Sequence, residues 1–424
     1  RVQVSFVKTG GRHHHLPFFQ LRSTSFVFVF LLGCGRVQLV LKGFYCCQFS
    51  GQPTMTMEID QKLFVKLKNS LPPELFERSE ARFLLNTLRA CFLWFAAAYV
   101  AAKFIPTSLG WWALPLWIVY AVVNGTFGFG IWVLAHECGH GAFSKSNFLN
   151  DLLGYPLHTF LLVPYFSWQY SHSVHHARTN HLTEGESFVP TVFGTRGEQW
   201  KNKWRRVVGD DVFSLFHNFY FVLFGWPQYL LTGVSGGPGR GRTNHFVPGE
   251  SNKLFPKNWW PKIWASTAGI LFVVGSVLYL SEQYGYGRMA GLFWAPHLVT
   301  NAWLVVYTYL HHTDDGAPHY DETTWNFTKG ALCTIERNYP DFINWLHFGI
   351  GNTHVVHHLF SQLPHYNAWK ARQILEPMYK DLYRVDKRPV WQALHENAVR
   401  CVSVREDPDA KGEWKYTSEP SASQ

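Results

Sequence analysis

Cysteine and charged residues are both scarce in this chain of 424 residues. The seven cysteines form no C-x-x-C pair, which excludes a zinc ribbon and a thioredoxin-like motif, and their odd number argues against a disulfide framework. A reducing, cytosol-facing location fits this usage. Only 16% of the residues are charged, whereas 47% are hydrophobic and 17% aromatic. The net charge is +9 without any nucleic-acid-binding module, so we expect the basic residues to lie in loops that face an anionic membrane leaflet.

Acidic residues are absent from residues 1–57, which contain six basic residues. The uncharged stretch Ser23–Gly35 is too short to span a bilayer. Three interpretations compete: a signal-type segment, an organelle transit peptide, or upstream sequence that is never translated. We favour the last, because Met55 and Met57 directly precede the first acidic residue, Glu58. This presequence or untranslated segment is excluded from the fold argument.

Long apolar runs are present, although a mean hydropathy of −0.09 conceals them. Trp111–Ala135 contains no charged residue, and a helix of that length rises about 37 Å, enough to cross a bilayer with tilt. We predict an all-α integral membrane protein with four transmembrane helices in two hairpins. The predicted parts are a cytosolic N-terminal segment (58–82), a membrane domain (83–405) with spans at about 83–105, 111–135, 263–281 and 289–310, and a polar, disordered tail (406–424).

A fifth apolar region, residues 212–233, has two interpretations. It is long enough to cross the membrane, but it contains His217, Asn218 and the Trp226–Pro227 pair. These polar and helix-breaking residues favour a helix that lies in the membrane interface.

The distribution of basic residues predicts the orientation of the chain. The loops 106–110 and 282–288 carry one basic residue between them, whereas the 136–262 segment on the opposite side carries twelve. Basic loops favour the cytosol. Four crossings therefore place both termini and every histidine-rich stretch on the cytosolic side, in a helical cap.

Three short stretches place eight histidines at helical spacing. Residues 172–176 and 354–358 both read H-x-x-H-H, and residues 136–140 read H-E-C-G-H. Residues at i, i+3 and i+4 of a helix share one face, with Cβ atoms roughly 5–6 Å apart. Neutral imidazole is the commonest metal ligand, and eight imidazoles exceed the needs of one ion. We predict a two-metal cluster built from histidine.

Two other motifs suggest different chemistry. The 136–140 stretch matches H-E-x-x-H, the signature of zinc proteases in which Glu137 acts as general base. One zinc needs only three protein ligands and a water, however, which leaves both H-x-x-H-H stretches without a role. The glycine-rich segment 233–242 could cradle a phosphate, but no predicted strand precedes it and no Gly-Lys-Ser/Thr follows, so we interpret it as a flexible loop.

The sequence also bears on the identity of the metal and on the roles of the remaining histidines. Zinc has no redox chemistry, and a histidine cluster at the ends of transmembrane helices suggests redox iron, two ions of which can activate O₂ against an apolar substrate. His297 lies within a predicted crossing and is either a functional residue or a polar helix contact. A histidine without a partner at ligand spacing is assigned no role; these are His158, His181, His217, His245, His319, His347, His365 and His395.

The sequence resembles the membrane fatty-acid desaturases, most specifically the plant and fungal oleate (Δ12/ω6) group. The resemblance runs from about residue 70 to about residue 400. It rests on the stretches AHECGHGAFS (135–144), HSVHH (172–176), TNHFVP (243–248), YLHHTD (309–314), PHYD (318–321) and THVVHHLFSQLPHY (353–366). Departures are Gly141, where many relatives have histidine, and residues 348–353.

The resemblance implies a non-haem diiron enzyme that uses O₂ and electrons from cytochrome b5 and its reductase. It implies insertion of a cis double bond at Δ12 of an oleoyl chain on phosphatidylcholine, at the endoplasmic reticulum rather than a plastid membrane. A Δ15/ω3 desaturase, a bifunctional enzyme and a fatty-acid hydroxylase are alternatives of the same chemistry. No H-P-G-G haem motif is present, so the electron donor is expected to dock from outside.

The resemblance also assigns site residues. Of the adjacent pair His311 and His312, we favour His312 because the relatives' pattern is H-T after a variable residue. Glu137 is assigned a role in orienting an imidazole; its alternative is a solvent-facing helix charge. Aromatic residues such as Phe127, Phe129, Trp132 and Trp303 could line an acyl tunnel or pack the core. The implied iron ligands are His136, His140, His172, His175, His176, His312, His354, His357 and His358.

Overall fold

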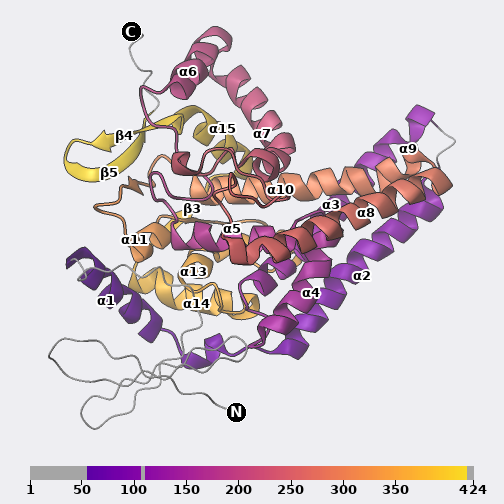
Figure 1. Ribbon diagram of the computed structural model, residues 1–424, viewed down its shortest axis with the longest axis horizontal. Coiled ribbons are helices and arrows are strands. Elements are labelled where there is room, and N and C mark those ends of the chain that lie inside the picture. Colours follow the sequence, from indigo (N-terminus) through magenta and orange to yellow (C-terminus); the bar gives the residue numbers. More distant parts are fainter. Residues whose placement is uncertain (1–54, 107–109, 418–424) are drawn as a thin grey trace, which may run out of the picture. The chain divides into compact units, whose positions relative to one another are not determined.

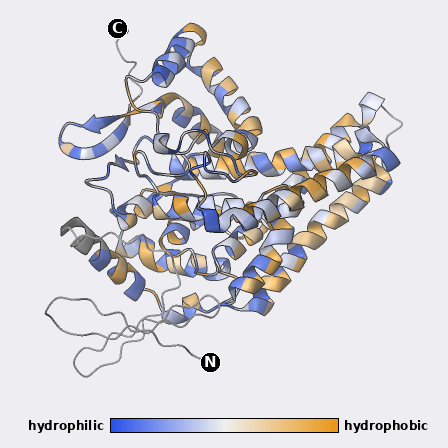
Figure 2. Cartoon of the chain, in the orientation of Figure 1, coloured by the Kyte–Doolittle hydropathy of each residue, from blue (hydrophilic) through white to orange (hydrophobic). Residues whose placement is uncertain are grey.

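A computed structural model of the chain describes residues 55–106 and 110–417 (Figure 1). Four helices in this part are long and apolar enough to cross a membrane, as the sequence predicts. Figure 2 shows hydrophobic residues concentrated along them. They are α2 (Glu80–Phe104), α3 (Leu114–Gly139, preceded by the 3-10 helix Gly110–Ala113), α8 (Trp260–Tyr284, preceded by the 3-10 helix Lys257–Trp259) and α10 (Ala295–His312, preceded by α9, Tyr286–Met289, and the π-helical segment Ala290–Trp294).

Helix α3 is the central member of the four. It packs against α2 and α10. Of its most hydrophobic 18-residue stretch, 72% is buried, compared with 22% of the corresponding stretches of α2 and α8. Glycines permit the close approach to α10: a Cβ on Gly125 would lie 2.6 Å from the carbonyl oxygen of Pro296. Small residues at such contacts allow membrane helices to pack backbone to backbone. The C-terminal end of α3, which carries His136, is therefore held rigidly against α10.

A substitution at this contact gives a testable prediction. Gly125→Val should lower the free energy of unfolding in detergent by about 1–3 kcal/mol, because the added carbons overpack the α3–α10 contact. Gly275→Val in α8 is the matched control, since a Cβ there meets nothing within 4 Å. Thermal unfolding of both variants checks this, and equal midpoints would contradict it.

Shorter helices cover the end of the four long helices that carries the histidines. Ser79 and Thr195 accept backbone N–H groups at the starts of α2 and α6, as N-cap residues do. These helices are α1 (Met55–Asn69), α4 (Asn147–Phe160), α5 (Tyr165–Ala177), α6 (Arg196–Val208), α7 (Asp210–Thr232), α11 (Phe327–Leu332), α12 (Asp341–Leu346), α13 (His354–Leu359), α14 (His365–Met378) and α15 (Val390–Arg400), with short turns at Pro73–Phe76, Pro238–Arg240 and Ile350–Asn352.

The described part also contains two small sheets, which the all-α expectation missed. One has the order β1-β5-β4 and is antiparallel, with His319 opposite Trp414 and Val404 opposite Tyr416. In the other, β2 and β3 are parallel. The strands are β1 (His319–Tyr320), β2 (Ile335–Arg337), β3 (Arg384–Asp386), β4 (Ser403–Asp407) and β5 (Ala410–Thr417).

Three further expectations can be compared with the structure. The tail after Glu406 was expected to be disordered, and this is wrong for β5, which pairs with both β1 and β4. The glycine-rich segment 233–242 packs against its neighbours, with Gly236 N–H bonded to Gly233 O and Val189 N–H bonded to Ser235 O. The expectation for residues 1–57 falls almost entirely outside the described residues.

Candidate metal centre

Five of the predicted ligands form a first cluster at the end of α3. Their ring nitrogens all lie within 4.8 Å of one another. The Nε2 atoms of neighbouring rings are 3.1–3.2 Å apart in the pairs His136–His140, His172–His176 and His176–His357. Four come from α3, α5 and α13, and His140 directly follows α3; the five are His136, His140, His172, His176 and His357.

The other four predicted ligands form a second cluster beside the first. His175, His312 and His358 have ring nitrogens within 4.8 Å of one another. The Nε2 atom of His312 lies 3.2 Å from that of His175 and 3.0 Å from that of His354. His176 and His358 stack in parallel between the two clusters, with ring centroids 4.0 Å apart. All nine predicted histidines are thus brought together in two adjacent groups.

Burial favours the neutral form of an imidazole, which is the form that binds metal. Burial lowers the pKa of His175 to about 4 and holds the pKa of His357 and His358 well below the usual value. A buried imidazolium loses its hydration, so protonation is unfavourable.

Thr179 fixes which nitrogen of His358 carries the proton. Its hydroxyl donates its one hydrogen to the carbonyl of His175 at 2.8 Å, so it can only accept from Nδ1–H of His358, 3.1 Å away. The lone pair of His358 therefore lies on Nε2, which is buried and has no hydrogen-bond partner in the described part of the chain. A buried lone pair directed into a group of imidazoles fits a metal ion.

Sequence reasoning missed Thr179 and also Ser187, whose hydroxyl lies 2.9 Å from Nδ1 of His175. For Thr179 a signal existed, because it follows His175 by four residues, and in the turn after α5 its hydroxyl reaches back to the carbonyl of His175. Ser187 lies in a loop, and no spacing rule connects it to the cluster.

Thr179→Val removes this acceptor while keeping the shape of the side chain. We expect metal affinity at the second cluster to fall by about 10–100-fold, as for other residues that orient metal-bound histidines. Ser173→Ala, within the stretch 172–176, is the control, because Ser173 is exposed and donates to the carbonyl of Tyr170. Titration with a chelator measures both variants; equal metal loss would contradict the role of Thr179.

Glu137 is buried, with 2% of its side chain exposed, so it is not a solvent-facing helix charge. Its Oε1 lies 3.5 Å from Nδ1 of His136 and 3.7 Å from Nδ1 of His357. The carboxylate therefore adjoins the outer nitrogens of two first-cluster rings, on α3 and α13.

The structure distinguishes His312 from its neighbour. His312 points into the second cluster, whereas Nδ1 of His311 bonds to the carbonyl of Ile335. His297 belongs to neither cluster, and its Nε2 lies 3.0 Å from Nδ2 of Asn301 on the same helix.

An apolar cavity adjoins both clusters. Its wall includes His136, His172, His175, His312 and His354. Of the four aromatic residues considered from the sequence, Phe129 and Trp132 line it, and Phe127 and Trp303 do not. Its other aromatic residues are Trp168, Phe188, Phe221, Trp226, Tyr229 and Tyr307. The arrangement can place part of an apolar chain beside two metal ions.

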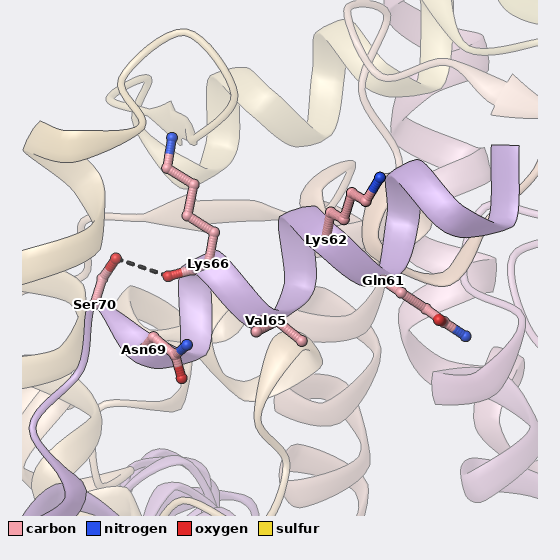
Figure 3. A pocket seen from close by; sticks show the side chains of 6 residues that line it. All are labelled: Gln61, Lys62, Val65, Lys66, Asn69 and Ser70. Carbon is pink, nitrogen blue, oxygen red and sulfur yellow. Dashed lines mark hydrogen bonds between the residues drawn. The ribbon is translucent and has the colours of Figure 1, made fainter. Parts of the chain in front are cut away.

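A second hollow lies along α1 and contains none of this chemistry. Figure 3 shows its six lining residues, among them Lys62, Lys66 and Ser70, with Ser70 Oγ donating to the carbonyl of Lys66 at 2.9 Å. It holds no histidine or carboxylate, and we assign it no site.

Comparison with known proteins agrees with the geometry. The family model described as "Fatty acid desaturase" matches residues 109–388. A Delta(12)-fatty-acid desaturase of Arabidopsis thaliana is 39% identical over 82% of this chain and 88% of the relative. A Delta(12) fatty acid desaturase of Mortierella alpina is 37% identical over 81% and 88%.

A bifunctional fatty acid conjugase/Delta(12)-oleate desaturase of Punica granatum is 36% identical over 80% of this chain and 84% of the relative. The family-model match covers α3, α8, α10 and all three histidine stretches. The chain therefore belongs to the fatty acid desaturase family.

Proposed function

We propose that this desaturase converts oleoyl chains of membrane lipids, phosphatidylcholine above all, to linoleoyl chains by inserting a cis double bond at Δ12. The observation that carries the proposal is the pair of histidine clusters in the wall of one apolar cavity. The names of the similar proteins support the Δ12 position.

We assign one iron ion to each cluster: the first to His136, His140, His172, His176 and His357, the second to His175, His312, His354 and His358. When bound, two irons supply the redox chemistry that activates O₂. Nitrogen-rich donor sets suit iron, and the unpaired lone pair of His358 supports this fit. In the net reaction, O₂, two electrons and two protons remove two hydrogens from adjacent carbons and leave an alkene and two waters.

The residues around the ions have distinct tasks in this proposal. The aromatic wall, including Phe129, Trp132 and Trp168, holds the acyl chain and excludes water from the reacting carbons. Thr179 and Ser187 keep His358 and His175 in the tautomer that presents Nε2. Glu137 orients His136 and His357 through their outer nitrogens.

We further propose that the four helices form two transmembrane hairpins in the endoplasmic reticulum membrane, with both termini and the histidine clusters in a cytosolic cap. The excess of basic residues in the 136–262 segment supports this orientation. The electron donors are cytochrome b5 and its reductase, and a basic cytosolic surface suits an acidic donor.

Expression in a host that makes oleate but no dienes tests the function. The proposal predicts a 9,12-diene in the host lipids. A trienoic or hydroxylated product would instead favour the ω3, bifunctional or hydroxylase alternatives. The H-E-x-x-H protease alternative predicts no new fatty acid at all and one zinc ion per chain.

A further inference from the structure

Helix α7 has an unusual outward face. Its inward residues, including Phe213, Trp226 and Leu230, are buried against the rest of the protein. Six outward residues are also apolar and exposed. The exposed fraction is 42% for Val212 and at least 50% for each of the other five. The exposed set recurs every three to four residues and so lies on one face: Val212, Leu215, Phe216, Phe219, Tyr220 and Phe224.

Helix α6 extends this face. Trp200, Trp204 and Val207 follow one another at helical spacing, and Trp200 and Val207 are exposed. Trp204 connects the two helices, with its ring centroid 5.3 Å from that of Phe213 and 6.2 Å from that of Phe216. The outward apolar residues of α6 and α7 form one surface, which we call the α6–α7 face.

The charges around the α6–α7 face are mainly basic. Lys203 and Arg206 are exposed on α6. Of the acidic residues nearby, Glu198 is buried and Asp210 pairs with Arg205 at 2.6 Å, whereas Asp211 is exposed and lies 3.6 Å from His395 of α15. Aromatic and apolar residues flanked by exposed cations are typical of helices that lie in an anionic membrane surface.

The position of α7 fits this composition. Figure 1 shows α7 running across the direction of α8 and α10. It packs on the histidine end of α10, where Phe221 lies against Tyr309 with ring centroids 5.1 Å apart. Tyr309 precedes His312, the last residue of that candidate span, by three residues. Helix α7 is itself not among the helices apolar enough to cross.

We propose that the α6–α7 face lies in the headgroup region of the leaflet on the histidine side and binds an anionic phospholipid surface. An interfacial helix explains why the exposed side of α7 is as apolar as its buried side. Because the inward residues Phe221, Gly225 and Trp226 also line the cavity, one helix separates the lipid from the catalytic cavity.

Spin labels on the full chain in nanodiscs of phosphatidylcholine and phosphatidylserine test the proposal. Labels are introduced at cysteines replacing Val212, Phe219 or Leu231, and the chain without an introduced cysteine gives the background. Phe272→Cys on α8 is the lipid-exposed reference, and Lys415→Cys on β5 is the water-exposed reference. Relaxation by oxygen and by a water-soluble nickel chelate reports the surroundings of each label.

The proposal predicts that the label at Phe219→Cys is as accessible to oxygen as the label at Phe272→Cys, and several-fold more accessible than the label at Lys415→Cys. It also predicts that the labels at residues 212 and 231 lie at equal depths in the membrane. Opposite depths at these two ends would overturn it in favour of a fifth crossing. Water-like values would overturn it outright, and labels shielded from both reagents would indicate a protein partner, such as a second copy, instead.

The preference of the α6–α7 face for anionic headgroups is tested separately. Lys203→Glu/Arg206→Glu should move the label at 219 toward water in discs containing phosphatidylserine and leave it unchanged in discs of phosphatidylcholine alone. An equal shift in both lipids would overturn the preference for anionic headgroups.

Discussion

Replacing His175 by alanine should abolish diene formation and remove one of the two iron ions. His175 belongs to the second cluster, where its Nε2 lies 3.2 Å from that of His312 and its Nδ1 contacts Ser187. Orienting residues around a metal typically contribute 10–100-fold to activity, so loss of a ligand itself should cost more than about 100-fold in product formed. With one ion lost, the pair that the proposed reaction requires would be incomplete.

The control for this variant is His395→Ala. His395 lies on α15 with 42% of its side chain exposed and takes no part in either cluster. Linoleate measured in the host lipids and iron measured on purified protein should both match the wild type. A His175→Ala protein that still makes the diene, or that keeps both irons, would contradict the ligand assignment.

Replacing Arg372 by methionine should destabilise the protein by about 3–5 kcal/mol, the usual cost of leaving a buried charge without its partner. Arg372 Nε lies 2.7 Å from Oε2 of Glu336, which is fully buried and also accepts from the hydroxyl of Tyr383. Arg372 donates as well to the carbonyl of Asn352, two residues before His354. The pair thus anchors α13, which carries three of the nine histidines.

The pH dependence of this variant has a definite sign. Burial raises the pKa of Glu336 and Arg372 opposes that rise, so its removal should raise the pKa further. A folded-state pKa above the unfolded value costs stability at high pH, and the cost falls as the carboxylate is protonated. Because the pKa of Glu336 is already raised to about 8, destabilisation by Arg372→Met should be similar at acidic and neutral pH and larger above about pH 8.

Arg400→Met is the matched control for Arg372→Met. Arg400 is half exposed and pairs with Asp315 and Glu396 at the surface, where an ion pair contributes at most about 1 kcal/mol. Unfolding in detergent should separate the two variants by several degrees. Equal midpoints would show that the Glu336–Arg372 pair does not anchor α13.

The sequence predicted which histidines converge but not how they divide. Each H-x-x-H-H stretch splits in the same manner: the residues at i and i+4, such as His172 and His176, share one cluster, and the residue at i+3, His175, joins the other. At 100° per residue, i+4 lies 40° from i, and i+3 lies 60° away on the other side. Which cluster each set joins depends on how α5 and α13 pack, which no local pattern determines.

The elements that sequence reasoning missed depend on distant contacts. β5 was interpreted as a disordered tail because its residues are polar, yet Trp414 and Tyr416 alternate as in a strand, and Tyr416 packs on His319 with ring centroids 5.3 Å apart. Its partner β1 lies about ninety residues earlier. The four apolar helices were predictable because bilayer thickness sets their length, a constraint that acts on local sequence alone.

Metal analysis of the purified wild-type chain tests the central claim most directly. Elemental analysis combined with Mössbauer spectroscopy of protein grown with ⁵⁷Fe counts the ions and identifies their ligands. Two nitrogen-ligated iron ions per chain are expected from the two histidine clusters. A single zinc ion per chain, with no iron, would contradict the account.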